Sequence, residues 1–178
     1  MNENYISGII AGDEKSLERL IESNSSSMYH YVYAIVKDKE DAEEIVSDIF
    51  FEVWKQRKNL NDIINFRSWI YTVAYRKSIS FLRKGTHLDT ISFDDLDDFL
   101  FTEVTLPDNN IISKEEIKSI NDAIQQLPAK CKHVFFLAKI ERLPYKEISD
   151  ILGISIKTIN NHIATALEKI SDYMKNQS

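Results

Sequence analysis

The sequence predicts an all-α protein made of two small helical domains that are joined by an acidic linker. Only 4 Gly and 3 Pro occur in 178 residues, which leaves room for long uninterrupted helices. Apolar residues recur three and four apart in several stretches, the spacing of one helix face. Because the composition changes sharply in mid-chain, we expect a domain at 1–85, a flexible linker at 86–113 and a second domain at 114–178.

The first strong pattern predicts a helix over residues 39–58. Asp38 followed by Asp41 resembles an N-terminal cap with acid in the first turn. Phe51 falls off the apolar stripe, so it could anchor a protein interface or be an ordinary exposed aromatic. The stripe itself consists of Ala42, Ile45, Val46, Ile49, Phe50, Val53 and Trp54.

A second pattern predicts a helix from about residue 65 to 84, where aromatic and basic side chains are interleaved. Residues 55–84 hold eight Lys or Arg against one acid, whereas residues 38–54 hold seven acids against one Lys. The basic run would attract a polyanion, and exposed aromatic side chains beside it could stack on the bases of strand-separated nucleic acid. Alternatively, the run is a basic helix face that contacts only solvent. The predicted buried stripe includes Phe66, Trp69 and Phe81, and it leaves outside or at its margin Tyr71, Tyr75, Arg67, Arg76 and Lys77.

The excess of acid in this chain lies in the predicted linker, residues 86–113. This segment carries seven acids and no Lys or Arg, while the net charge of the whole chain is −6. Phe93, Phe99 and Phe101 interrupt the acidic run. We therefore expect a docked segment that could occupy a cationic channel, with a solubilising spacer as the alternative.

Residues 143–170 predict two helices joined by a tight turn, an arrangement that can present the second helix to DNA. Gly153 tolerates the positive φ of a helix end, and Ser155 can cap the following helix. The first helix has an apolar face of Ile148, Ile151 and Leu152, and the second has a stripe of Ile159, Ile163, Ala166, Leu167, Ile170, Tyr173 and Met174. The polar set outside that stripe can bond to phosphates and base edges, unless the pair is an ordinary solvated hairpin; it comprises Lys157, Thr158, Asn160, Asn161, His162 and Thr165.

The composition argues against several other classes of protein. A single cysteine, Cys131, permits neither an internal disulfide nor a thiolate zinc cluster, and we expect it to be a buried or partly buried thiol. The four His show no ligand spacing, and no activated nucleophile or phosphate-binding glycine loop is present. We therefore expect no metal, no cofactor and no enzyme activity. With no apolar run long enough to span a bilayer and no leader, a cytoplasmic protein is expected.

Three motifs, in this order, resemble the bacterial RNA polymerase sigma factors of the sigma-70 family, in the compact two-domain form called extracytoplasmic-function (ECF) sigma factors. DKEDAEEIVSDIFFEVWK at 38–55 is similar to the segment that docks on the clamp helices of the polymerase largest subunit, with Ser47 where Gln is usual. NFRSWIYTVAYRKSISFLRK at 65–84 resembles the promoter-melting and −10 recognition segment. Residues 127–170, with a Leu-Pro opening and an E-I-S-x-x-L-G-I-S turn, resemble the −35-binding domain.

The resemblance implies a region 2 helical bundle and a region 4 helix-turn-helix domain in a transcription initiation factor. Such a factor binds core RNA polymerase, recognises −10 and −35 promoter elements and helps open the duplex, and an anti-sigma factor is a further candidate partner. The implied polymerase contacts are Glu44, Asp48, Phe50 and Phe51. The implied −10 contacts are Arg67, Trp69, Tyr75, Arg76, Lys77, Arg83 and Lys84. The implied −35 contacts are Ser155, Lys157, Thr158, Asn160, Asn161, His162 and Thr165.

One departure from the family weakens the expected DNA contact. Many members carry Arg or Lys where Asn161, His162 and Thr165 stand, so we expect weak DNA binding by the free protein and an affinity that depends on polymerase tethering both domains. The acidic linker or acidic helix could also cover a basic surface in the free chain. Two other functions fit parts of the sequence: a free-standing helix-turn-helix regulator, and a sigma-like decoy that binds polymerase without reading promoters.

Overall fold

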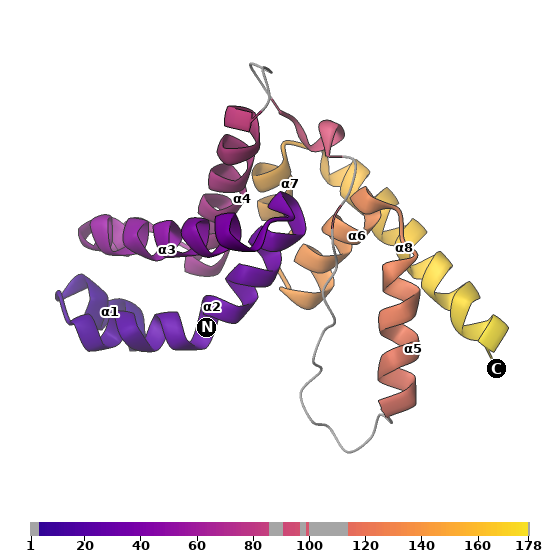
Figure 1. Cartoon of the computed structure of the whole chain (residues 1–178), viewed down its shortest axis with the longest axis horizontal. Coiled ribbons are helices and arrows are strands. Elements are labelled where there is room, and N and C mark those ends of the chain that lie inside the picture. Colours follow the sequence, from indigo (N-terminus) through magenta and orange to yellow (C-terminus); the bar gives the residue numbers. More distant parts are fainter. Residues whose placement is uncertain (1–3, 86–90, 97–98, 100–113, 178) are drawn as a thin grey trace. The chain divides into compact units, whose positions relative to one another are not determined.

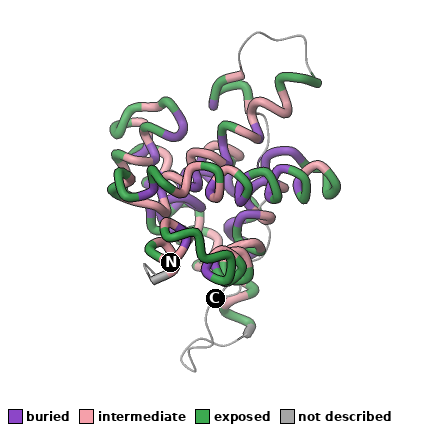
Figure 2. The backbone as a smooth tube through the Cα atoms, turned by 90° about the vertical axis from the view of Figure 1, so that its left-hand side faces the viewer, coloured by how far each residue is buried: buried purple, intermediate pink, exposed green. Residues whose placement is uncertain are grey.

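The computed structural model describes residues 4–85, 91–96, 99 and 114–177 (Figure 1). Every regular element in that part of the chain is helical, which confirms the all-α prediction. The chain divides into two compact units, Met1–Ile91 and Ser92–Ser178. Along the helices of both units, buried and exposed residues alternate, as expected of amphipathic helices (Figure 2).

The first unit is a helical bundle. Its elements are α1 (Asn4–Ile10), α2 (Glu14–Val36), α3 (Lys39–Lys55), the 3-10 helix η1 (Arg57–Asp62) and α4 (Phe66–Gly85). Helices α2, α3 and α4 pack against one another, and α1 packs on α2 and η1. In its core, the rings of Tyr31 and Tyr71 meet edge to face with centroids 5.0 Å apart, and Leu20 and Ile49 are also fully buried. Burying each large apolar side chain contributes roughly 1.5–3 kcal/mol, so this core dominates the stability of the unit.

Helix α3 begins as the sequence predicts and ends sooner. The Asp41 N–H donates to the Asp38 carboxylate at 3.0 Å, so Asp38 is the N-cap. The α-helix stops at Lys55 rather than at residue 58, because the chain tightens there into η1. The Arg57 guanidinium donates to the Trp54 carbonyl at 2.9 Å and so satisfies one of the carbonyls left free at the helix end.

Helix α4 is rotated about its axis relative to the prediction. Tyr71 and Tyr75 are buried, whereas Phe66, Trp69 and Phe81 are only partly buried. The predicted placement of these aromatics was therefore wrong. The buried face also includes Ser68 and Ser78, whose small side chains let α4 approach its neighbours closely. The Ser78 hydroxyl donates to the Ala74 carbonyl at 2.8 Å, which offsets the cost of burying that hydroxyl.

The second unit contains the helix-turn-helix. Its elements are the short 3-10 helix η2 (Phe93–Asp95), α5 (Lys114–Gln125), α6 (Ala129–Phe135), the π-helical turn η3 (Phe136–Ile140), α7 (Tyr145–Leu152) and α8 (Ile156–Gln177). Helix α8 packs on α5, α6 and α7. Gly153 ends α7 with φ +69°, and the Ser155 hydroxyl accepts from the Thr158 N–H at 3.0 Å, so both predicted turn residues are confirmed.

The predicted apolar stripe of α8 is confirmed in part. Ile159, Ile163 and Ala166 are buried as predicted, but Leu167 is 50% exposed and was wrongly assigned to the buried stripe.

Two aromatic residues of the predicted linker are buried. Phe93 and Phe99 are 3% and 2% exposed, and their rings contact His133, His162 and Phe136 of the second unit. Phe101 and most of segment 86–113 lie outside the described residues, so the predicted linker boundaries stay a prediction.

Candidate functional site

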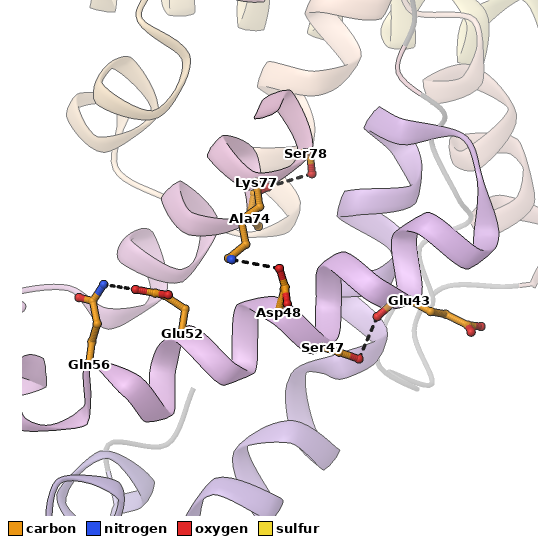
Figure 3. A network of polar contacts seen from close by, with 8 residues as sticks. All are labelled: Glu43, Ser47, Asp48, Glu52, Gln56, Ala74, Lys77 and Ser78. Atoms are coloured by element: carbon orange, nitrogen blue, oxygen red, sulfur yellow. Dashed lines mark hydrogen bonds and ion pairs between the residues drawn. The ribbon is translucent and has the colours of Figure 1, made fainter. Parts of the chain in front are cut away.

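An ion pair joins the acidic face of α3 to the basic helix α4. The Lys77 Nζ donates to the Asp48 carboxylate at 3.3 Å, with 62% of the Asp48 side chain exposed (Figure 3). Sequence analysis assigned Asp48 to polymerase and Lys77 to DNA, and the structure brings the two together. An exposed pair of this kind contributes at most about 1 kcal/mol, so either charge can be given up to a partner at little cost. Glu44 is also exposed on α3.

Beside this face, a groove of about 630 Å³ lies between α2 and α3. Phe51, which is 64% exposed, stands at the groove, whereas Phe50 is buried and contributes to its lining. The walls are mainly apolar and carry the acid Glu43; they are formed by Leu17, Ile21, Ser25, Ser26, Tyr29, Glu43, Val46, Ser47, Phe50, Phe51 and Trp54. An apolar groove with an exposed aromatic suits the docking of a partner helix.

Sequence reasoning singled out Phe50 and Phe51 on the α3 side of this groove and gave no indication of its α2 side. Phe51 stood out because it fell off the apolar stripe of its own helix. Leu17, Ile21 and Tyr29 gave no comparable indication, because they line the groove only through the packing of α2 against α3. Phe50 was predicted as a polymerase contact, and its burial limits it to shaping the groove from below.

Helix α4 presents cations and partly buried aromatics. Arg76, Arg83 and Lys84 are exposed, and Arg67 is partly buried. The Phe66 and Trp69 rings are 5.6 Å apart and both retain accessible surface, so they could stack with bases. Just before the helix, Ile64 is fully exposed, a feature that the sequence did not indicate.

The Tyr75 ring is not available to a base in this structure. It is 7% exposed, although sequence analysis placed it with the DNA-contacting residues. Since it lies on the side of α4 that faces the bundle, its contribution here is to hold α4 in place.

On the recognition helix α8, the predicted −35 residues divide into two groups. Lys157, Asn160 and Asn161 are exposed, whereas Thr158, His162 and Thr165 are partly buried. The Asn160 amide donates one hydrogen bond to the Ile156 carbonyl at 2.9 Å, which leaves its second N–H and its carbonyl oxygen for other contacts. The Ser155 hydroxyl is occupied by its capping bond and by Thr158, whose hydroxyl lies 2.8 Å away.

His162 stands apart because it packs against other parts of its own unit. Its Nδ1 lies 3.4 Å from the Cys131 Sγ, and its ring centroid is 6.0 Å from that of Phe93. Burial, helped by the Lys130 charge and opposed by Asp94, lowers the pKa of His162. Burial likewise raises the pKa of the Cys131 thiol, in keeping with the buried thiol predicted from sequence. His162 is therefore a neutral, partly covered side chain rather than a free DNA contact.

Comparison with known proteins shows the family of this chain. The family model for Sigma-70 region 2 matches residues 20–87, and the model for Sigma-70 region 4 matches residues 117–170. The chain belongs to the sigma-70 family, in the ECF group. It is therefore a transcription initiation factor of a family that is not a family of enzymes, and its partners are core RNA polymerase and promoter DNA.

The relatives of this sigma factor match along most of their length. It is 22% identical over 182 residues to the ECF RNA polymerase sigma factor SigW of Bacillus subtilis, covering 98% of this chain and 97% of the relative. It is 23% identical to the ECF RNA polymerase sigma-E factor of Haemophilus influenzae, covering 90% and 88%. The fold resembles CnrH in complex with the cytosolic domain of CnrY, with a TM-score of 0.58, 14% identity and 99% of both chains covered. It also resembles the sigma factor RpoE in complex with the anti-sigma factor NepR from Bartonella quintana, with a TM-score of 0.58, 17% identity and 90% and 98% covered.

In the part of the chain that the structure describes, no group of three or more His, Cys, Asp or Glu side chains is placed to hold a metal ion. Among the same residues, no helix combines the length and apolar character that crossing a membrane requires.

Proposed function

We propose that this sigma factor docks on core polymerase through the acidic face of α3 and the neighbouring α2–α3 groove. The exposed Phe51 beside an apolar groove carries this proposal, because soluble proteins seldom leave a large aromatic open next to such a hollow without a partner. Glu43, Glu44 and Asp48 add negative charge around it. A partner helix with an apolar stripe and flanking cations would complement both features.

We propose that α4 binds the −10 element in its single-stranded form. Phe66 and Trp69 offer ring faces to unstacked bases, and the exposed Arg76, Arg83 and Lys84 attract the backbone phosphates. Stabilising the separated strands in this way favours melting without any covalent chemistry. Tyr75 is left out of this contact set, since its ring is buried.

We propose that α8 binds the −35 element in the major groove. Lys157 is suited to a phosphate, and Asn161 is suited to a bidentate contact with adenine. With so few cations, α8 alone should bind weakly, and the affinity of the holoenzyme then comes from contacts made by both domains at once.

We also propose that an anti-sigma factor regulates this protein in the cytoplasm, where polymerase acts. The support is that one structural relative is described in complex with the anti-sigma factor NepR and another with the cytosolic domain of CnrY. A purified complex from the native host would test this part of the proposal.

Co-elution with core polymerase from the host tests the docking surface. Phe51→Ala should weaken the affinity for core polymerase by roughly tenfold, the scale of an interface hot spot, and leave the fold intact because the ring is exposed. Ile64→Ala is the matched control, as it also truncates an exposed apolar side chain of the same unit. Equal affinities for wild type and Phe51→Ala would reject the groove as the docking site.

Transcription from a promoter of the native regulon tests the DNA contacts. Arg76→Ala combined with Lys77→Ala should reduce promoter opening while co-elution with polymerase persists. Retained transcription would favour the sigma-like decoy. A folded wild-type protein that never binds its host's polymerase would favour the free-standing regulator.

A further inference from the structure

A short stretch of the predicted linker is docked on the second unit. We call it the strap: the described residues Ser92–Leu96 together with Phe99. It includes the η2 turn, which lies beside α8 and α6 within this unit (Figure 1). Neither the charge pattern nor the helical spacing of the sequence indicated this placement.

Two aromatic side chains hold the strap in place. The Phe99 ring stacks on His133 of α6 with centroids 4.3 Å apart and an interplanar angle of 13°, and it lies 5.8 Å from the Phe136 ring. The Phe93 ring contacts His133 at 5.7 Å and His162 of the recognition helix at 6.0 Å. Both Phe rings are almost fully buried, so they act as anchors rather than as surface side chains.

Polar contacts fix the shape of the strap between these anchors. The Ser92 N–H and hydroxyl both donate to the Asp95 carboxylate at 2.7 Å, which closes the η2 turn. The Lys130 Nζ pairs with the Asp94 carboxylate at 2.9 Å and so ties the turn to α6. These exposed polar contacts add little free energy, but they orient the turn so that both Phe rings can insert.

Docking of the strap changes the length of chain that joins the two units. With the strap docked, only residues 86–91 connect α4 to the second unit, and a fully extended chain of that length reaches about 25 Å. With the strap released, residues 86–113 connect α4 to α5 and can reach about 100 Å. Promoter elements centred about 25 base pairs apart are separated by about 85 Å along B-DNA.

We propose that the strap is a releasable clasp, which shortens the tether in the free protein and whose release makes it easier for the two domains to reach both promoter elements at once. The docked strap also covers one flank of α8, where Phe93 contacts His162 and Asp94 carries a negative charge beside it. Thr158 and Thr165 lie one helical turn from His162 on the same flank, so DNA would approach this flank more readily once the strap has left. This clasp rests on the proposed function, since it matters only if both domains bind promoter DNA.

A pair of insertions in the full chain tests whether the strap is docked. A dozen Gly/Ser residues inserted between His87 and Leu88 would lengthen the tether, and small-angle scattering should show a radius of gyration larger by roughly a tenth. The same insertion between Glu103 and Val104 lies beyond the strap, so it should change the radius by less than a third as much. Equal expansion by the two insertions would overturn the clasp.

A double substitution then tests release. Phe93→Ser with Phe99→Ser should raise the radius of gyration by roughly a fifth, and promoter-complex formation by the holoenzyme should become about tenfold faster. Phe51→Ser is the matched control for scattering, since it makes the same chemical change on the first unit. If the double variant keeps the helical circular dichroism of the wild type but forms promoter complexes more slowly, the inhibitory role of the strap is rejected.

These outcomes separate the clasp from the proposed function. Should the double variant lose its helical circular dichroism, the insertion pair, which leaves every buried side chain in place, decides the question alone. Scattering of the free protein tests the clasp and does not depend on polymerase. Co-elution of the wild type with polymerase tests the proposed function and does not depend on the strap. Each proposal can therefore fail while the other stands.

Discussion

The register of α4 gives the sharpest prediction about this sigma factor. The structure buries Tyr75 and leaves Trp69 partly exposed, the reverse of what the sequence pattern predicts. We therefore expect Tyr75→Ala to destabilise the first unit strongly, and Trp69→Ala to destabilise it less while impairing promoter opening.

The burial of each ring sets the size of the effect. Tyr75 is 7% exposed, so its truncation removes an aromatic ring from a packed core, a change that costs about 3 kcal/mol. For a unit of this size, 1 kcal/mol shifts Tm by about 4–8 °C, so Tm should fall by at least about 12 °C. Trp69 is only partly buried in the folded state, so its truncation should cost clearly less than that of Tyr75, about 1–2 kcal/mol.

Tryptophan fluorescence provides an assay that is specific to this unit. The chain has 2 Trp, and both Trp54 and Trp69 lie in the first unit, so a fluorescence melt follows that unit alone, even in the Trp69→Ala variant. Arg76→Ala, at an exposed neighbouring position, is the control and should melt with the wild type. A larger loss of Tm in Trp69→Ala than in Tyr75→Ala would show that α4 packs in the register predicted from sequence.

Three further predictions follow from the charges and backbone angles. Asp48→Asn should lower the free energy of unfolding by less than about 1 kcal/mol because its pair with Lys77 is exposed, and a fluorescence melt that shows a larger loss would contradict this. Gly153→Ala should destabilise the second unit by about 1–2 kcal/mol because φ at this position is +69°, although no atom crowds the new Cβ. A Tm from far-UV circular dichroism equal to that of the wild type would contradict this prediction. Burial lowers the pKa of His133 from 6.5 to about 3, so the unfolded state takes up the proton first. The free energy of unfolding should therefore be unaffected by His133 above pH 6.5, and it should fall by up to about 1.4 kcal/mol per pH unit as the pH decreases from 6.5 towards 3. If the free energy of unfolding of His133→Asn fell with the same pH slope, His133 would not be the group responsible.

In our proposals, the strap and the groove act at different steps of initiation. The groove is formed by α2 and α3 of the first unit and is open to a partner, whereas the strap occupies a surface of the second unit. Polymerase binding at the first unit would hold one end of the tether, so that DNA or polymerase contacts of the second unit could then draw the strap away. Both proposals therefore predict that polymerase comes before stable promoter binding.

Several features of this protein could be predicted from its sequence alone. The helix-turn-helix followed from local features: Gly153 supplies the positive φ and Ser155 supplies the cap, and both act within a few residues. The cap of α3 at Asp38 is equally local. The division of charge between α3 and α4 is a property of the residue order itself, and the family motifs are likewise read along the chain.

Only the tertiary structure decided which faces are buried and which segments meet. Aromatic residues lie on several sides of α4, so helical spacing gave the period of the helix without its rotation, and packing against Tyr31 selected Tyr71 for the core. The groove needs α2 and α3 together, and the strap joins Phe99 to His133 across a long stretch of chain. Contacts between residues distant in sequence depend on how whole surfaces fit together, and local patterns carry little information about that fit.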